Sequence, residues 1–185
     1  MKSNIYGAIM GAVIGDAMGL PFEFKKKGSI KKRHINKPRD LGHHNLPLGT
    51  WSDDSSMIFC TMHSMLNGYN PIDIGNTFCK WKYEAFWTPY GILFDIGGTT
   101  ARAIMHINLR KDYSGLNDEK DCGNGSLMRI LPILFYIKNN RANRFKIIEE
   151  VSSLTHSNIT CIIACSIYLE LCLNILDGDT KKSPI

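Results

Sequence analysis

The stretch Gly49-Thr50-Trp51-Ser52-Asp53-Asp54-Ser55-Ser56-Met57 opens an amphipathic segment of the chain. It places the hydroxyl of Ser52 and the adjacent carboxylates of Asp53 and Asp54 at the predicted start of a helix. Mg²⁺ prefers oxygen ligands and keeps several waters, so this set could hold the ion and leave positions open for a substrate. Serine at an N-cap and aspartate in the first turn also stabilise a helix start without any ligand. A cation site and a plain helix cap therefore both stay open here.

Almost every other periodic segment is typical of a helix, and alternating strand patterns are scarce. Gly68 predicts the end of one helix, and Asn70-Pro71 predicts the start of the next. Pro132 should divide the apolar segment over 127–137. The predicted helices cover roughly 5–20, 52–67, 70–88, 99–109, 143–154 and 159–176. With no internal repeat or low-complexity tract, we expect a single, all-α, compact multi-helix domain over residues 1–185.

The first predicted helix carries glycine at positions 7, 11, 15 and 19, one every four residues. Glycine on one stripe costs helix propensity, so the pattern predicts another backbone passing very close to it. Asp16 continues the apolar line of Ile5, Ile9 and Ala12, which should be buried. A buried carboxylate needs a partner, and we expect one for Asp16.

Composition indicates an ordered globular protein, with 44% apolar and 21% charged residues. Much of the net charge of +5 comes from the clusters Lys25–Lys27 and Lys31–Arg33, which we interpret as a solvated loop. Nucleic acid is the less favoured partner because no aromatic residues alternate with these charges. The six cysteines contain no Cys-x-x-Cys pair and suit reduced thiols, which favours a cytoplasmic location. No stretch is expected to be long and apolar enough to span a membrane, so no membrane partner is predicted.

Other polar groups lie at or near predicted helix starts. Gly123-Asn124-Gly125-Ser126 could present free N–H groups to a phosphate, or could simply be a turn. Asp95 could contact a ligand or cap the following helix. His156 is more typical of a cap or loop residue than of a catalyst. Cys122 beside the glycines is not favoured as a nucleophile, because nothing local should lower its pKa.

Five segments together resemble the ADP-ribosylglycohydrolase family, in the family's order and across nearly the whole chain. They are Gly11-Ala12-Val13-Ile14-Gly15-Asp16-Ala17-Met18-Gly19-Leu20-Pro21-Phe22-Glu23, Trp51-Ser52-Asp53-Asp54-Ser55, Asp95-Ile96-Gly97, Gly123-Asn124-Gly125-Ser126-Leu127-Met128-Arg129 and Thr155-His156. Their joint occurrence shifts the preferred interpretation of Ser52, Asp53 and Asp54 from a cap to a metal site.

The resemblance implies an all-α fold with two Mg²⁺ ions in a cleft that binds ADP-ribose. It implies that Ser52, Asp53 and Asp54 are metal ligands, with serine in place of the commoner threonine. It also implies that Asp53, Asp54 and Glu23 serve catalysis, with Glu23 as a candidate acid or base. The implied substrate-binding residues are Asp95 at the ribose, Gly123, Asn124, Gly125 and Ser126 at the diphosphate, and His156 lining the pocket.

One departure concerns the family's second ligand set, an Asp-x-Asp-Thr motif well after the Thr-His segment. Asp177-Gly178-Asp179-Thr180 has these letters but directly follows a predicted helix, so we interpret it as a helix exit rather than a metal site. The resemblance therefore predicts a C-terminally incomplete domain with at most one well-supported Mg²⁺. Helices that should cover residues 5–20 and 159–176 would be missing.

Three hypotheses follow from the resemblance. The leading one is a magnesium-dependent hydrolase that cleaves the bond between ADP-ribose and a modified acceptor, with ADP-ribose or an ADP-ribosylated protein as partner. The second is a catalytically impaired ADP-ribose-binding or scaffold protein. The third is a truncated or split chain whose exposed helix faces need self-association or a partner chain.

Overall fold

The structure is a computed structural model that describes residues 2–26, 28–30 and 41–178. These residues form helices and short 3₁₀ turns, with one isolated bridge between Leu116 and His156 and no named strand. The all-α fold expected from the sequence is confirmed. The α-helices are α1 (Lys2–Gly19), α3 (Asp53–Met65), α4 (Pro71–Glu84), α5 (Gly98–Arg110), α6 (Ile133–Ile137), α7 (Arg144–Ser152) and α8 (Ile159–Leu176). The 3₁₀ turns are η1 (Leu20–Phe22), η2 (Glu119–Asp121), η3 (Leu127–Arg129) and η4 (Arg141–Asn143).

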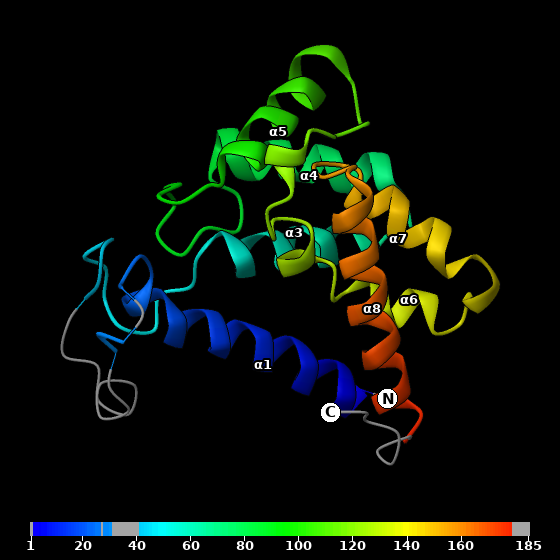
Figure 1. The fold of residues 1–185 in the computed structure, drawn as a ribbon, viewed down its shortest axis with the longest axis horizontal. Coiled ribbons are helices and arrows are strands. Elements are labelled where there is room, and N and C mark those ends of the chain that lie inside the picture. The colour runs from blue at the N-terminus through cyan, green and yellow to red at the C-terminus, as the bar shows by residue number, and fades with distance from the viewer. Residues whose placement is uncertain (1, 27, 31–40, 179–185) are drawn as a thin grey trace.

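Helices α3, α4 and α5 pack in succession, α3 on α4 and α4 on α5, and each contributes buried side chains to the core (Figure 1). Asn70 caps α4 by accepting hydrogen bonds from the backbone N–H groups of Ile72 and Asp73, as its sequence position predicts. The helix then presents Phe78 and Trp81, both fully buried, to the core. Helix α3 packs directly on α4, so the buried side chains of α4 support α3 from the side of the core.

Pro132 divides the apolar segment over 127–137 as predicted, giving η3 before it and α6 after it. The side chain of Arg129 in η3 is fully buried, lies over the ring of Phe78 at 4.6 Å, and donates hydrogen bonds to the Val151 carbonyl and the Thr155 hydroxyl. One charged side chain thus joins η3 to α4 and to the end of α7.

Helix α1 lies along one edge of the molecule (Figure 1). Its Ile9 reaches the core, and its Asp16 contacts the start of α3. The expected close backbone over the glycine stripe is not provided by the described residues: a Cβ added at Gly7, Gly11, Gly15 or Gly19 would meet nothing within 4 Å. That expectation was wrong for the described part of the chain, and much of the stripe instead borders a cleft.

Helix α8 presents a stripe of exposed branched apolar residues at four-residue spacing. Its members Ile163, Ile167, Leu171 and Ile175 are 49–66% exposed. Residues Asn4–Phe22 and Ile159–Leu176 are each long and apolar enough to cross a membrane by length and composition, so the expectation that no stretch meets this test was wrong. A core helix of a soluble protein or a signal sequence passes the same test.

Some expectations fall partly outside the described residues. They concern the basic clusters, of which Lys27 and Lys31–Arg33 are not described, and the Asp-x-Asp-Thr pattern, of which Asp179 and Thr180 are not described. Asp177 follows α8 and pairs with Arg141 at 2.5 Å. The helix-exit interpretation of this segment agrees with that contact.

Candidate active-site cleft

A cleft of about 560 Å³ opens between α1, the start of α3 and the loop before η3. Its volume lies within the range of small-molecule sites. One wall is formed by small residues of α1, so a ligand can approach that backbone closely. The cleft is lined by Gly11, Ala12, Gly15, Asp16, Gly19, Leu20, Phe22, Glu23, Ser52, Asp54, Ile58, Asn124 and Met128. Four of the sequence-predicted site residues, Glu23, Ser52, Asp54 and Asn124, therefore border one cavity.

Asp16 fixes the start of α3 against α1. Its carboxylate accepts hydrogen bonds from the backbone N–H groups of Ser52 and Ser55, at 2.9 and 3.1 Å, and from both serine hydroxyls, at 2.7 and 2.5 Å. The Ser52 hydroxyl in turn accepts a 3.2 Å hydrogen bond from the backbone N–H of Asp54. Ser52 is thus the N-cap of α3, and Asp16 has the partner that the sequence required.

Asp53 and Asp54 occupy the first turn of α3 and have unusual electrostatic surroundings. Burial and the neighbouring carboxylates, Asp95 foremost, raise the pKa of Asp53 to about 7. Burial and the charges of Asp16, Glu23 and Asp95 raise the pKa of Asp54 to about 6. Among the described residues, no side chain or backbone group donates a hydrogen bond to the carboxylate of Asp53. A bound cation would reduce the electrostatic repulsion within such a cluster of carboxylates.

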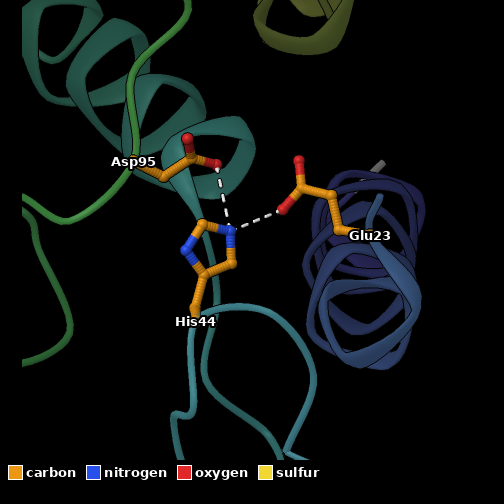
Figure 2. Close-up of side chains that lie close together, drawn as sticks. All are labelled: Glu23, His44 and Asp95. Atoms are coloured by element: carbon orange, nitrogen blue, oxygen red, sulfur yellow. Dashed lines mark hydrogen bonds and ion pairs between the residues drawn. The ribbon is translucent and has the colours of Figure 1, made fainter. Parts of the chain in front are cut away.

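Glu23, Asp95 and His44 come together from three separate segments (Figure 2). Glu23 follows η1, Asp95 precedes α5, and His44 lies in the loop between η1 and α3. The Nε2 atom of His44 lies 2.8 Å from Glu23 Oε2 and 3.9 Å from Asp95 Oδ2. Sequence analysis predicted roles for Glu23 and Asp95 but did not identify His44. The only available signal was the pair His43-His44 in a long polar loop.

The Gly123–Ser126 loop leads into the 3₁₀ turn η3 rather than into the α-helix expected after it. Gly125 has a steric role, because an added Cβ would lie 2.6 Å from His156 Cε1 and 2.8 Å from Thr100 Oγ1. Asn124 borders the cleft, whereas the Ser126 hydroxyl is buried 3.5 Å from the sulfur of Cys165. The structure therefore places the members of this loop in different surroundings.

His156 lies beneath the glycines of this loop, is only 2% exposed, and does not border the cleft described above. The Thr155 hydroxyl accepts a hydrogen bond from Arg129 and can donate to His156 Nδ1 at 2.8 Å, which leaves the ring proton on Nε2. Burial, assisted by the charge of Arg129, lowers the pKa of His156 to about 4. His156 is therefore a neutral, buried support for the loop in this structure.

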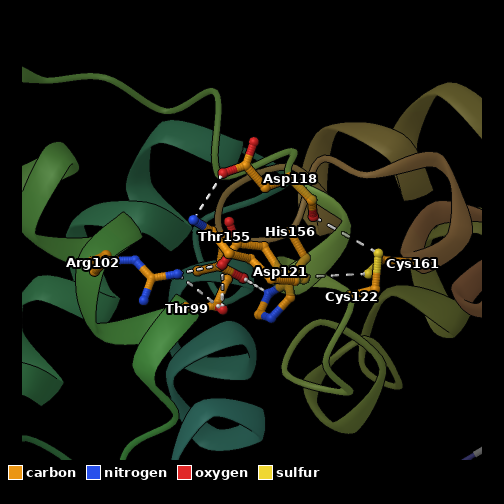
Figure 3. A network of polar contacts seen from close by, with 9 residues as sticks. Thr99, Arg102, Asp118, Asp121, Cys122, Thr155, His156 and Cys161 are labelled. Carbon is orange, nitrogen blue, oxygen red and sulfur yellow. Dashed lines mark hydrogen bonds and ion pairs between the residues drawn. The ribbon is translucent and has the colours of Figure 1, made fainter.

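A buried carboxylate anchors the residues just before this loop (Figure 3). Asp121 is 3% exposed, pairs with the guanidinium of Arg102, and accepts a 2.8 Å hydrogen bond from the Thr99 hydroxyl. Thr99 and Arg102 both belong to the first half of α5. The network fixes the approach to Gly123 against α5.

The fold and the cleft define a class of protein. It is all-α, and carboxylates near the ends of its helices lie beside a cavity of a size that suits a small molecule. The family model described as ADP-ribosylglycohydrolase matches residues 1–184, and the chain belongs to that family.

Several relatives carry related names. The chain is 28% identical to "ADP-ribosylarginine hydrolase Tri1" of Pseudomonas putida, over 96% of this chain and 49% of that protein. It is 25% identical to "ADP-ribosyl-[dinitrogen reductase] glycohydrolase" of Rhodospirillum rubrum, over 96% of this chain and 59% of that protein. A solved "ADP-ribosylglycohydrolase-related protein complex" superposes with a TM-score of 0.78 at 28% identity, over 94% of this chain and 56% of that one. The chain thus spans about half the length of the relatives it matches.

Proposed function

We propose that this chain carries the nucleotide-sugar cleft of a magnesium-dependent hydrolase that releases ADP-ribose from a modified acceptor. The observation that carries the proposal is a cleft with a glycine-rich α1 wall that is bordered by Glu23, Ser52 and Asp54, with Asp53 adjacent in the first turn of α3. Family membership supports hydrolysis of an ADP-ribosyl bond as the reaction class. The relatives' names support ADP-ribosylated protein as the kind of substrate.

The residues at the start of α3 fit a magnesium ion by their chemistry. Asp53 and Asp54 offer carboxylate oxygens, and burial together with the neighbouring carboxylates raises the pKa of both groups. The Ser52 hydroxyl, which donates to Asp16 and accepts from the Asp54 N–H, keeps one lone pair for such an ion. A bound Mg²⁺ would act as a Lewis acid that orients ribose hydroxyls and lowers the pKa of water.

Glu23 is the group that we propose to move protons. Cleavage at the ribose C1″ atom needs a water as nucleophile and a proton for the leaving group, as in other glycoside hydrolysis. Glu23 borders the cleft, and its side chain is 35% exposed, so it can exchange a proton with water or substrate there. The position of Asp95 beside Glu23 and His44 supports a ribose-side role for Asp95.

The diphosphate is proposed to lie against the Gly123–Ser126 loop. Asn124 borders the same cleft as Glu23 and Asp54, which supports a ligand spanning from the carboxylates to this loop. Glycine at 123 leaves backbone open to a phosphate oxygen. His156 would then act by supporting the loop from below rather than by contacting the ligand.

A second candidate function is binding of ADP-ribose without turnover. The cleft itself supports it, because a cavity bordered by Glu23, Asp54 and Asn124 can hold a ligand whether or not turnover follows. The exposed apolar faces of α1 and α8 support the related proposal that a partner chain, or a second copy, completes the fold.

The deciding experiment incubates the chain with arginine-linked and serine-linked ADP-ribosyl peptides and measures free ADP-ribose by mass spectrometry. We expect release with Mg²⁺, none with a chelator, and a loss of at least about a hundredfold in Asp53→Asn and Asp54→Asn. Asp118→Asn is the matched control, because Asp118 is an exposed surface aspartate paired with Lys120. ADP-ribose binding without release would favour the binding module, and equal activity in all variants would contradict the metal assignment.

A further inference from the structure

We propose that Glu23, His44 and Asp95 form a binding site for a divalent transition-metal ion, with the His44 imidazole as its nitrogen ligand. The proposal does not depend on hydrolysis, and it goes beyond the all-oxygen magnesium set at Ser52, Asp53 and Asp54. An ion held here would occupy Glu23 and Asp95, so this metal-bound state is an alternative to the state in which Glu23 transfers a proton and Asp95 faces the ribose. The donor set of one imidazole and two carboxylates is suited to ions such as Mn²⁺, Fe²⁺ or Zn²⁺.

The three donor groups already lie at near-ligand spacing. One oxygen from each carboxylate and the Nε2 atom of His44 all lie within 4.8 Å of one another (Figure 2). Donors held at about 2.1 Å around one ion are roughly 3.0–3.5 Å apart. The 2.8 Å and 3.9 Å distances from His44 to Glu23 and Asp95 bracket that range. A small shift of the Asp95 side chain would complete the set.

The His44 ring is held in place by aromatic neighbours on two sides. The Phe94 ring, next to Asp95 in the chain, meets it edge-on at 5.5 Å, and the Phe24 ring, next to Glu23, lies at 6.1 Å. The His44 side chain is only 12% exposed. The residues next to Glu23 and Asp95 in the chain thus both contact the imidazole. The Nε2 atom of the ring points between the two carboxylates. A ligand fixed in this way loses little freedom when an ion binds.

The surrounding charge also favours a cation. The charges of Asp16, Glu23 and Asp95 act on Asp53 and Asp54, so five carboxylates lie close together in this region. Within the described ranges, no ion pair joins any of them to a lysine or an arginine. A hydrogen bond from His44 serves one oxygen of Glu23, and His44 Nε2 lies 3.9 Å from Asp95 Oδ2, so in the part of the chain that the structure describes neither acid has a lysine or arginine partner.

The simplest probe is Mn²⁺ alone, added to the whole chain and followed by electron paramagnetic resonance. We expect bound Mn²⁺ to show modulation from one imidazole nitrogen in its spin-echo envelope. Replacing ¹⁴N-histidine with ¹⁵N-histidine in the unmutated protein should replace that signal with the ¹⁵N pattern. This arm needs no substitution, so a folding defect cannot obscure the result.

Two variants then assign the nitrogen to one residue. His44→Gln should lose the nitrogen modulation and weaken Mn²⁺ binding at least about tenfold. His106→Gln is the matched control, since His106 lies in the second half of α5 and belongs to neither the donor set nor the rings around His44, and it should keep both. Bound Mn²⁺ with no nitrogen modulation, or modulation that survives in His44→Gln, would overturn the proposal.

These outcomes are separable from those of the proposed function. Magnesium-dependent release of ADP-ribose together with nitrogen-free Mn²⁺ would leave the hydrolase standing and overturn the His44 site. Nitrogen-coupled Mn²⁺ in a chain that releases no ADP-ribose would support the His44 site and count against the hydrolase.

Discussion

At the scale of single residues, neighbouring carboxylates in this protein have opposite environments. Asp16 accepts four hydrogen bonds from Ser52 and Ser55, and these hydrogen bonds hold α1 against the start of α3. Asp53, one residue along from Ser52, is surrounded by acids and has a raised pKa. Asp53 and Asp54 follow Ser52 directly, whereas Asp16 lies 36 residues before Ser52, in α1. Only the three-dimensional contacts separate the structural acid from the candidate ligands.

Removing the structural acid should weaken the fold. In Asp16→Ala the N–H and hydroxyl groups of Ser52 and Ser55 lose a charged acceptor, and hydrogen bonds to charged groups contribute about 1.5–3 kcal/mol each without being additive. We expect the free energy of unfolding to fall by roughly 2–4 kcal/mol in a urea titration. Glu149→Ala on α7 is a control remote from this contact and should change it little. Equal stability of both variants would contradict the anchoring role of Asp16.

His156 should make stability depend on pH in a defined window. Its pKa is lowered from 6.5 to about 4 in the folded chain, so the unfolded chain binds more protons between these values. The contribution of neutral His156 is fully present above pH 6.5 and is lost as the pH falls towards 4. At about 1.4 kcal/mol per pH unit, the loss reaches roughly 3 kcal/mol.

The measurement compares unfolding free energies of the wild type and His156→Gln across this window. Because the raised pKa of Asp53 acts in the opposite direction and is common to both proteins, the difference between them isolates the histidine. The wild type should lose more stability than the variant between pH 6.5 and pH 4. A constant difference would show that His156 is not held neutral.

At the scale of elements, the sequence predicted helices better than it predicted what lies between them. Asn70-Pro71 marked the start of α4 correctly because capping is a local property. Pro132 likewise predicted the break between η3 and α6. The glycine stripe of α1 was misinterpreted, since glycine spacing does not distinguish a packed backbone from the wall of a cleft. His44 was missed because a loop residue carries no periodic signal, and its partners lie 21 and 51 residues away in the chain.

The loop before η3 offers a direct test of packing at this scale. Gly125→Ala would place a methyl group 2.6 Å from His156 Cε1 and 2.8 Å from Thr100 Oγ1, so the loop or the ring must move. We expect a loss of about 1–3 kcal/mol in unfolding free energy and weaker ADP-ribose binding by calorimetry.

Gly97→Ala is the matched control for this substitution. Its added Cβ would meet Thr100 Oγ1 at 3.8 Å, an ordinary contact, and the backbone there has a φ of −63°. The control should cost less than Gly125→Ala, about 0.5–1 kcal/mol, because Gly97 is the N-cap of α5 and alanine caps a helix less well than glycine. If both glycines tolerate alanine equally, Gly125 does not position the loop through His156.

At the scale of the whole molecule, two long helices leave apolar surface uncovered. Only 17% of the Asn4–Phe22 window and 22% of the Ile159–Leu176 window are buried. The chain spans about half the length of its matched relatives. We propose that a partner chain or a second copy packs on these faces. Sequence analysis anticipated the exposure of both helices, because the resemblance implied helices that would cover them.

The purified 185-residue chain should therefore self-associate or bind a hydrophobic dye. Replacing Ile167, which is 57% exposed on the stripe of α8, with glutamate should reduce dye binding and shift the chain towards a monomer. Light scattering after size-exclusion chromatography measures the mass. Ser166→Glu, one position away and off that stripe, is the control and should change the mass much less. A monodisperse wild-type monomer without dye binding would contradict an uncovered apolar face.

Diffraction can show directly whether a divalent cation and a nucleotide sugar share the cleft at the start of α3. Crystals grown with Mn²⁺ and ADP-ribose should show an anomalous peak beside Asp53 and Asp54, with the diphosphate towards Asn124. A cleft without density at saturating ligand, with both carboxylates turned towards backbone N–H groups, would contradict it.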